Sequence, residues 1–220
     1  MTFGGFLPED FLRFLDSDLE ARVAYMRDDL HPRLRNFGWE LAEELRKRLS
    51  IELRAQLRSG RWFRHPWASW VTLILSEEKV RSDNSRPRLC VLVDQYECIV
   101  GFMQCVWKRR WKTLTKQAAA LEKVMSKATR GTPQLQLALA HWVKQQDDTW
   151  ERTTSLFKTP KAVLAAAAQW GQDFVIVGRV YPFPPEADLL TSPRFAGEAA
   201  AVLQKAWPVY RYAFERTGTN

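Results

Sequence analysis

The chain has 220 residues, 46% of them hydrophobic and 12% aromatic, which is enough apolar material for a buried core and excludes an intrinsically disordered protein. Its formal net charge of +8 and pI near 9.6 favour an anionic partner, such as nucleic acid or an acidic surface. No apolar run reaches the length of about 18 residues that suggests a membrane span, and the N-terminus lacks the basic and apolar regions of a signal peptide. We therefore expect a cytoplasmic protein without a membrane partner.

The first part of the chain is predicted to be helical. Pro8 favours the first turn of a short helix at residues 7–15, and the Asp-Ser-Asp of residues 16–18 supplies a break and an N-cap. Between residues 19 and 57, apolar side chains recur at spacings of three and four, which predicts two or three amphipathic helices. Pro32 is expected to kink or restart this helical region, because proline has no backbone N–H.

The chain after Gly60 becomes rich in β-branched and aromatic residues, as in strands. We expect strands at residues 67–76, 88–94 and 98–105, forming a three-stranded antiparallel meander. Residues 106–130 follow directly and are predicted to form one amphipathic helix.

The spacing of apolar residues is less regular in the second half of the chain. Residues 134–146 fit either a strand or a helix, and we favour a strand for their first half. A helix at residues 161–170, a strand at 174–181 and a terminal helix at 195–216 follow. These elements predict a single α+β domain over residues 1–220.

The predicted domain is an antiparallel sheet packed by helices. Residues 1–59 form a helical N-terminal part, and residues 60–220 form the sheet with its covering helices. No linker long enough to separate two domains is present in the sequence.

The predicted helix at residues 106–130 is the most strongly basic segment of the chain, with Glu122 as its single acid. At about 100° per residue, its lysines fall on one face and its apolar residues on the other. The basic face contains Lys108, Lys112, Lys116, Lys123 and Lys127. The apolar face contains Trp107, Trp111, Leu114, Ala118, Leu121 and Met125. A row of cations on a helix suits phosphate contacts, which position a nucleic acid without reading its sequence. An exposed face near an acidic neighbour of the same chain would give the same pattern.

A second cationic cluster precedes the first predicted strand. Arg58, Arg61, Arg64 and His65 alternate with Trp62, Phe63 and Trp67. Cations mixed with stacking surfaces are typical of proteins that bind phosphate or single-stranded nucleic acid. Alternatively, the aromatic rings belong to the core and the arginines surround its edge.

The sequence contains no recognisable catalytic signature, since a nucleophile elbow, a phosphate-binding loop, a dinucleotide-binding turn and a zinc-protease pair are all missing. The spacing of Cys90, Cys98 and Cys105 does not supply paired zinc ligands, and two of these cysteines lie in apolar runs. We expect buried thiols, no metal, no cofactor and no catalytic residues, so a non-enzymatic protein is favoured.

The N-terminal third resembles the opening of the YktB-like proteins, a family of uncharacterised bacterial proteins. That family has a D-F-x-x-F start, an L-E-x-R-M-x-x-x-R helix and a P-x-L-x-x-L-G continuation. The matching residues here are Asp10, Phe11, Phe14, Leu19, Glu20, Arg22, Arg27, Pro32, Leu34 and Gly38. The sequence departs from this pattern after Pro66, where the family's H-A-R-R-T-x-N-P segment is not recognisable. No activity is established for that family, so the resemblance informs the fold.

A partial resemblance to the N-terminal DNA-reading domains of McrB-like restriction proteins rests on a P-W strand, a G-x-I-x-x-x-Y strand and a closing helix. Pro66, Trp67, Gly178 and residues 207–210 correspond. This resemblance implies DNA as a partner.

The sequence therefore predicts a non-enzymatic protein that binds nucleic acid, DNA or RNA, through a basic helix face and an Arg/Trp-rich loop. The predicted binding residues are Arg58, Arg61, Arg64, His65, Lys108, Arg109, Arg110, Lys112, Lys116, Lys123 and Lys127. The alternative is an accessory subunit of a larger bacterial complex, whose basic face meets an acidic protein partner.

Overall fold

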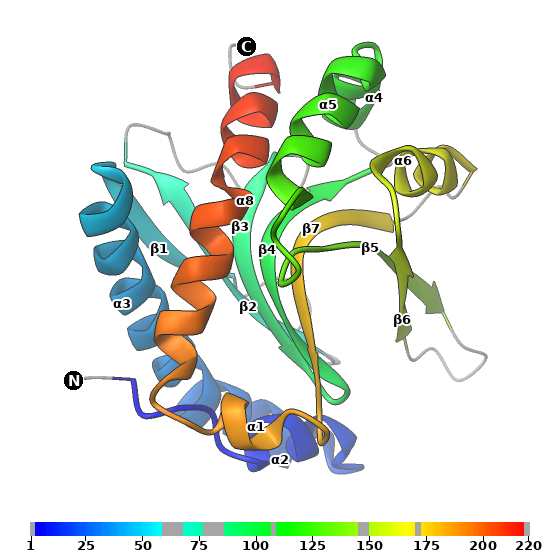
Figure 1. The fold of residues 1–220 in the computed structure, drawn as a ribbon. Helices are drawn as coiled ribbons and strands as arrows, with labels where there is room; N and C mark the ends of the chain where they lie inside the picture. Colours follow the sequence, from blue (N-terminus) through cyan, green and yellow to red (C-terminus); the bar gives the residue numbers. More distant parts are fainter. Residues whose placement is uncertain are drawn as a thin grey trace. The chain divides into compact units, whose positions relative to one another are not determined.

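The protein has an α+β fold, as predicted, in which a seven-stranded antiparallel sheet is packed by helices (Figure 1). The computed structural model describes residues 3–58, 68–76, 86–106, 109–144, 150–169 and 173–217. The strand order is β1-β2-β3-β4-β7-β5-β6. The expected meander is confirmed by the neighbouring strands β2 (Ala68–Leu75), β3 (Arg88–Asp94) and β4 (Glu97–Cys105).

Two compact units interleave along the chain. The first contains Met1–Lys79, Cys90–Val100 and Val180–Gln204, and the second contains Val80–Leu89, Gly101–Arg179 and Lys205–Asn220. Three strands and the last helix contribute residues to both units, so each unit is described separately below. The prediction of a single domain stays a prediction.

The N-terminal helices of the first unit form largely as expected. Helix α1 (Glu9–Leu12) continues into a 3₁₀ turn, Arg13–Leu15. Asp18 caps helix α2 (Leu19–Tyr25), because its carboxylate accepts from two backbone N–H groups of the first turn. A π-helical turn, Met26–Leu30, then leads into α3 (His31–Leu49). Pro32 lies in the first turn of α3, where its missing N–H is tolerated. The backbone is helical at both Leu30 and His31, so the helix changes from π to α there without a break.

Helix α3 lies against strands β1 (Leu53–Arg58) and β2 of the same unit. Gly38 faces this sheet, and a Cβ atom added there would lie 2.5 Å from Cγ2 of Val71 and 2.8 Å from Cβ of Ala55. Real Cβ atoms do not approach other atoms so closely. Glycine is therefore required for helix and sheet to pack at this separation.

Aromatic side chains fill the core beside α3. Phe3 stacks on Phe37 with ring centroids 4.1 Å apart, and Phe6 and Phe195 pack around the same ring. The N-terminal segment is held by its backbone as well, because the N–H of Phe3 donates to Oε2 of Glu40 at 2.7 Å and the N–H of Phe6 donates to the carbonyl of Leu190 at 2.9 Å. Leu190 ends the short helix α7 (Ala187–Leu190).

The second unit contains β5 (Gln136–Lys144), which pairs antiparallel with β6 (Trp150–Phe157) and with β7 (Asp173–Pro182). The preference for a strand at the start of 134–146 is therefore confirmed. Helix α6 (Pro160–Gln169) lies between β6 and β7 in the chain, and α8 (Phe195–Thr217) ends the fold.

Two strands were not predicted from the sequence. Strand β1 was expected to be helical, but Ser50 adopts a left-handed conformation with φ of 54°, which ends α3, and the following residues pair with β2. Residues 1–59 are consequently not all helical. Strand β6 was not expected, because it is an edge strand with polar side chains.

Candidate nucleic-acid interface

The basic segment forms two helices rather than one. Helix α4 spans Arg109–Thr115 and helix α5 spans Ala118–Thr129. The prediction of a continuous helix at residues 106–130 is therefore wrong. Gln117 has a non-helical backbone with φ of −120° and ψ of 40°, and its carbonyl accepts from the N–H groups of Ala120 and Leu121 to begin α5.

Two local interactions accompany the break. The hydroxyl of Thr115 donates to the carbonyl of Trp111 at 3.1 Å, one turn back. The amide oxygen of Gln117 accepts from the hydroxyl of Tyr212, in α8 of the same unit, at 3.0 Å. A side chain 95 residues away therefore holds the residue at which the helix is interrupted.

The prediction that one side of this segment is buried is confirmed for four of its described apolar residues. Trp111, Leu114, Leu121 and Met125 are all buried, with at most 5% of the side chain exposed. Ala118 was predicted to lie on the same face but is exposed, because the break places it at the start of a new helix.

The basic side of the segment is exposed to solvent. Lys112, Lys116, Lys123 and Lys127 are exposed, and none of the four makes an ion pair within the described part of the chain. The cations of α3 differ in this respect, since Arg46 and Lys47 pair with Glu43 and Glu44. These four lysines thus carry positive charge that the chain's own described carboxylates do not neutralise.

The exposed side of α5 is hollowed. Ala119, Glu122, Lys123, Ser126, Lys127 and Arg130 line an open concavity of about 510 Å³. Three of these six side chains are cationic and one is acidic, so the concavity has a net positive charge. The spacing of these residues along one helix puts them on one side of α5.

The C-terminal half of α8 lies beside α5 in the second unit (Figure 1). Besides the contact from Tyr212, Nζ of Lys205 donates to Oε1 of Gln134 at 2.6 Å. These polar contacts fix both ends of the α5 region on α8.

The structure places only part of the predicted binding set. It describes Arg110, Lys112, Lys116, Lys123 and Lys127 fully, and it shows the backbone of Arg58 at the end of β1 and of Arg109 at the start of α4. Arg61, Arg64, His65 and Lys108 lie outside the described residues, and so do Trp62, Phe63 and Trp67 of the same loop. The Arg/Trp-rich loop therefore stays a sequence-based prediction.

Arg130 and Ser126 line the concavity but were not among the predicted residues. Their spacing was a usable signal, because Arg130 follows Lys127 by three positions and Lys123 by seven, which is one helix face. The predicted set of binding residues ended at Lys127, so it did not include Arg130.

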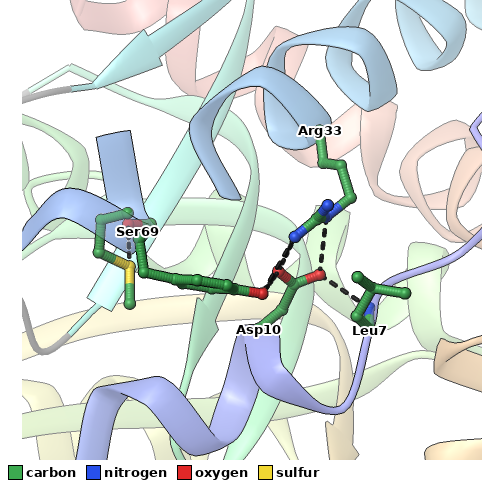
Figure 2. Close-up of polar contacts among 6 residues, drawn as sticks. Leu7, Asp10, Arg33 and Ser69 are labelled. Carbon is green, nitrogen blue, oxygen red and sulfur yellow. Dashed lines mark hydrogen bonds and ion pairs between the residues drawn. The ribbon is translucent and has the colours of Figure 1, made fainter. Parts of the chain in front are cut away.

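A second polar cluster lies in the first unit, around a buried carboxylate (Figure 2). Asp10 is fully buried and accepts four hydrogen bonds, from the N–H of Leu7, the hydroxyl of Tyr25, and Nε and Nη2 of Arg33. The shortest of these, from Nη2 of Arg33 to Oδ1, measures 2.7 Å. The cluster joins α1, α2 and α3, and each partner of the carboxylate is a donor, so its role is structural.

The pKa values of two side chains, Tyr25 of this cluster and His31 of α3, are shifted from their ordinary values. Burial, with the charge and hydrogen bond of Asp10, raises the pKa of Tyr25, so the phenol stays a donor. Burial and the neighbouring Arg35 lower the pKa of His31. Nε2 of His31 lies 3.2 Å from the hydroxyl of Ser69.

The cysteines behave as the sequence indicates, since Cys90, Cys98 and Cys105 are buried free thiols. Within the described ranges, no three His, Cys, Asp or Glu side chains gather in a way that would hold a metal ion. In the same part of the chain, no helix has both the length and the apolar character needed to cross a membrane.

No protein-family model matches this chain. It is 26% identical over 222 residues to the UPF0637 protein lmo1065 of Listeria monocytogenes serovar 1/2a, a match that covers 98% of this chain and 100% of that protein. It is also 26% identical over 225 residues to the UPF0637 protein lwe1043 of Listeria welshimeri serovar 6b, with the same coverage. This is distant homology over nearly the whole chain, including the basic helices. It does not confirm the YktB-like or McrB-like resemblance.

Proposed function

We propose that this protein binds nucleic acid through the exposed cations of α4, of α5 and of the turn between them. The observation that carries the proposal is the group formed by Lys112, Lys116, Lys123 and Lys127, which are exposed and have no ion-pair partner among the described residues. Binding a polyanion would neutralise these charges and release the counter-ions condensed on its phosphates, which favours association.

The buried side of the same helices supports the proposal. Trp111, Leu121 and Met125 anchor α4 and α5 in the core, so the lysines project from a rigid support. Contacts of this kind bind phosphates without reading bases. The sequence resemblance to McrB-like DNA-reading domains agrees with this function, although the Pro66 and Trp67 that contribute to it lie outside the described residues.

The direct test is a salt series with the purified, nucleic-acid-free protein and fluorescently labelled DNA and RNA. We expect binding at low salt that weakens steeply as salt rises, with a slope of log K against log salt of about −0.9 per phosphate contacted on a duplex. If neither nucleic acid binds at low salt, the proposal is wrong. The alternative function, binding of an acidic protein partner by this basic surface, would then be favoured.

Neutralising two cations of the concavity should change that slope. For Lys123→Gln combined with Lys127→Gln, we expect the slope to become shallower by about 2 and the affinity at 100 mM salt to fall by about 10-fold or more. The matched control is Arg46→Gln with Lys47→Gln, which removes the same charge from cations that already pair with Glu43 and Glu44. An equal loss in both variants would mean that only net charge matters and that α5 is not the binding site.

Removing the single acid of the concavity should strengthen binding. Glu122 lines the concavity beside Lys123 and Lys127, so its carboxylate repels an approaching phosphate. We expect Glu122→Gln to bind several-fold more tightly than the unmodified protein in the same assay, with the gain reduced at high salt. A gain in affinity is not explained by partial unfolding. Unchanged or weaker binding would show that no phosphate approaches this part of α5.

A further inference from the structure

We propose that Tyr212 of α8 is a positioning residue for the nucleic-acid interface, because its hydroxyl holds the joint at which α4 ends and α5 begins. The joint is the two-residue turn formed by Lys116 and Gln117. This inference rests on the proposed function and adds to it the contact that keeps the four exposed lysines in one arrangement. Tyr212 acts through Gln117 and needs no contact with the nucleic acid.

The local sequence does not explain the joint. Lysine and glutamine are both good helix formers, and no glycine or proline lies among residues 113–121. As one uninterrupted helix, residues 106–130 would carry their lysines on a single face, at about 100° per residue. Contacts from elsewhere in the fold therefore stabilise the joint.

Gln117 is bonded through both its backbone and its side chain. Its N–H donates to the carbonyl of Leu114 at 3.0 Å, which closes α4, and its carbonyl accepts from two N–H groups in the first turn of α5. Its side-chain oxygen accepts from the hydroxyl of Tyr212 at 3.0 Å. Among the described residues, neither Lys116 nor Gln117 makes another side-chain hydrogen bond or ion pair. The contact from Tyr212 thus ties the side chains of the joint to α8.

Tyr212 is itself held in place by α8. Tyr210 and Ala213, on either side of it in the helix, are fully buried. One turn later, the guanidinium carbon of Arg216 lies 5.8 Å from the centre of the Tyr212 ring, which is within cation–π distance. The C-terminal end of α8 lies beside α5 in the second unit (Figure 1). The hydroxyl of Tyr212 is therefore a fixed point for Gln117.

The joint divides the lysines of the proposed interface into two groups. Lys112 lies in α4 and Lys116 in the joint itself, whereas Lys123 and Lys127 lie in α5. Both groups contact one phosphate backbone together only when their spacing and direction match it. A spacing that is fixed before binding lowers the entropy cost of making these contacts at once. If the contact from Tyr212 is lost, the groups can move relative to each other, and fewer phosphates are neutralised together.

The test compares Tyr212→Phe with the unmodified full chain in the same salt series. This substitution removes a hydroxyl without changing the charge, and one hydrogen bond is worth a factor of about 2–10 in an equilibrium constant. We expect the affinity for labelled DNA or RNA to fall about 3-fold or more. We also expect the slope of log K against log salt to become shallower by about 1, because fewer phosphates are contacted together.

The salt slope separates positioning from a merely structural role, which would change the thermal midpoint alone. A slope that is not shallower in folded Tyr212→Phe would overturn the inference while the proposed function stands. If the unmodified protein binds neither DNA nor RNA, the proposed function itself is overturned. Thermal melts verify that the variant folds.

A double variant tests whether Tyr212 acts through Gln117. Gln117→Met keeps an unbranched side chain but removes the oxygen that accepts the hydrogen bond. Since the two residues act as a unit, Tyr212→Phe combined with Gln117→Met should bind about as tightly as either single variant. Additive losses of affinity would overturn the positioning role, because Tyr212 would then contribute to binding independently of the joint.

The control is Gln134→Met, which makes the same substitution at a second polar contact of α8. It removes the acceptor for Nζ of Lys205 without touching the joint. We expect its salt slope to equal that of the unmodified protein. An equally shallow slope in Gln134→Met and Tyr212→Phe would mean that any loosening of α8 has this effect, and would overturn the assignment to Tyr212.

Discussion

Replacing both Lys112 and Lys116 by glutamate is expected to abolish binding to nucleic acid. Both lysines are exposed and without an ion pair in the described part of the chain, so each substitution turns an attraction for phosphate into a repulsion of similar size. We expect the affinity for a DNA duplex at low salt to fall by more than about 100-fold, measured by fluorescence anisotropy.

The control for this charge reversal is Arg46→Glu with Lys47→Glu in α3. Those cations are exposed too, but they pair with Glu43 and Glu44, so they are not free to bind phosphate. We expect this variant to retain most of the binding, and thermal melts of both variants verify that they fold. Retained binding by the folded Lys112→Glu, Lys116→Glu variant would exclude α4 from the interface.

Substitution of Asp10 should lower the free energy of unfolding more than any other substitution proposed here. Asp10→Asn removes the negative charge that four donors share and sets an amide N–H₂ against the guanidinium of Arg33. Breaking a buried ion pair costs about 3–5 kcal/mol, and the value here should be near the lower end because Arg33 is 27% exposed and regains contact with water. We expect a loss of about 3 kcal/mol in the free energy of unfolding, measured by urea denaturation.

Asp28→Asn provides the comparison, because Asp28 pairs with Arg27 at the surface, where both side chains are more than half exposed. We expect no measurable change in the urea midpoint for that variant. The double variant Asp10→Asn, Arg33→Gln should lose less than the sum of the two single losses, since the groups act together. If Asp10→Asn unfolds at the same urea concentration as Asp28→Asn, the cluster does not stabilise the fold.

Most strands could be predicted from the sequence, because their β-branched and apolar composition matches their buried positions in the sheet. Strand β3 forms at the predicted residues, and every one of them is buried. Strand β1 was missed for a physical reason: Leu53 continues the leucine spacing of α3, and nothing local shows that Ser50 ends the helix. The pairing of residues 53–58 with β2 outweighs helix propensity there.

The candidate site could be predicted only in part for a related reason. Helical periodicity correctly identified Trp111 and Met125 as buried and Lys123 and Lys127 as exposed. It could not identify the interruption at Gln117, because that residue is held by Tyr212 from the far end of the chain. Likewise, Asp10 and Arg33 meet only when three helices pack, so no local pattern marks them as partners.

The attachment of the N-terminal segment has a consequence for how the protein can be expressed and handled. Phe3, Phe6 and Phe11 are buried, and the backbone of this segment is bonded to α3 and to the end of α7. A product that starts after these residues would lose part of its core rather than a dispensable tail. Its uncovered aromatic pocket would make it a target for chaperones and proteases, so translation from an internal start codon would yield short-lived protein.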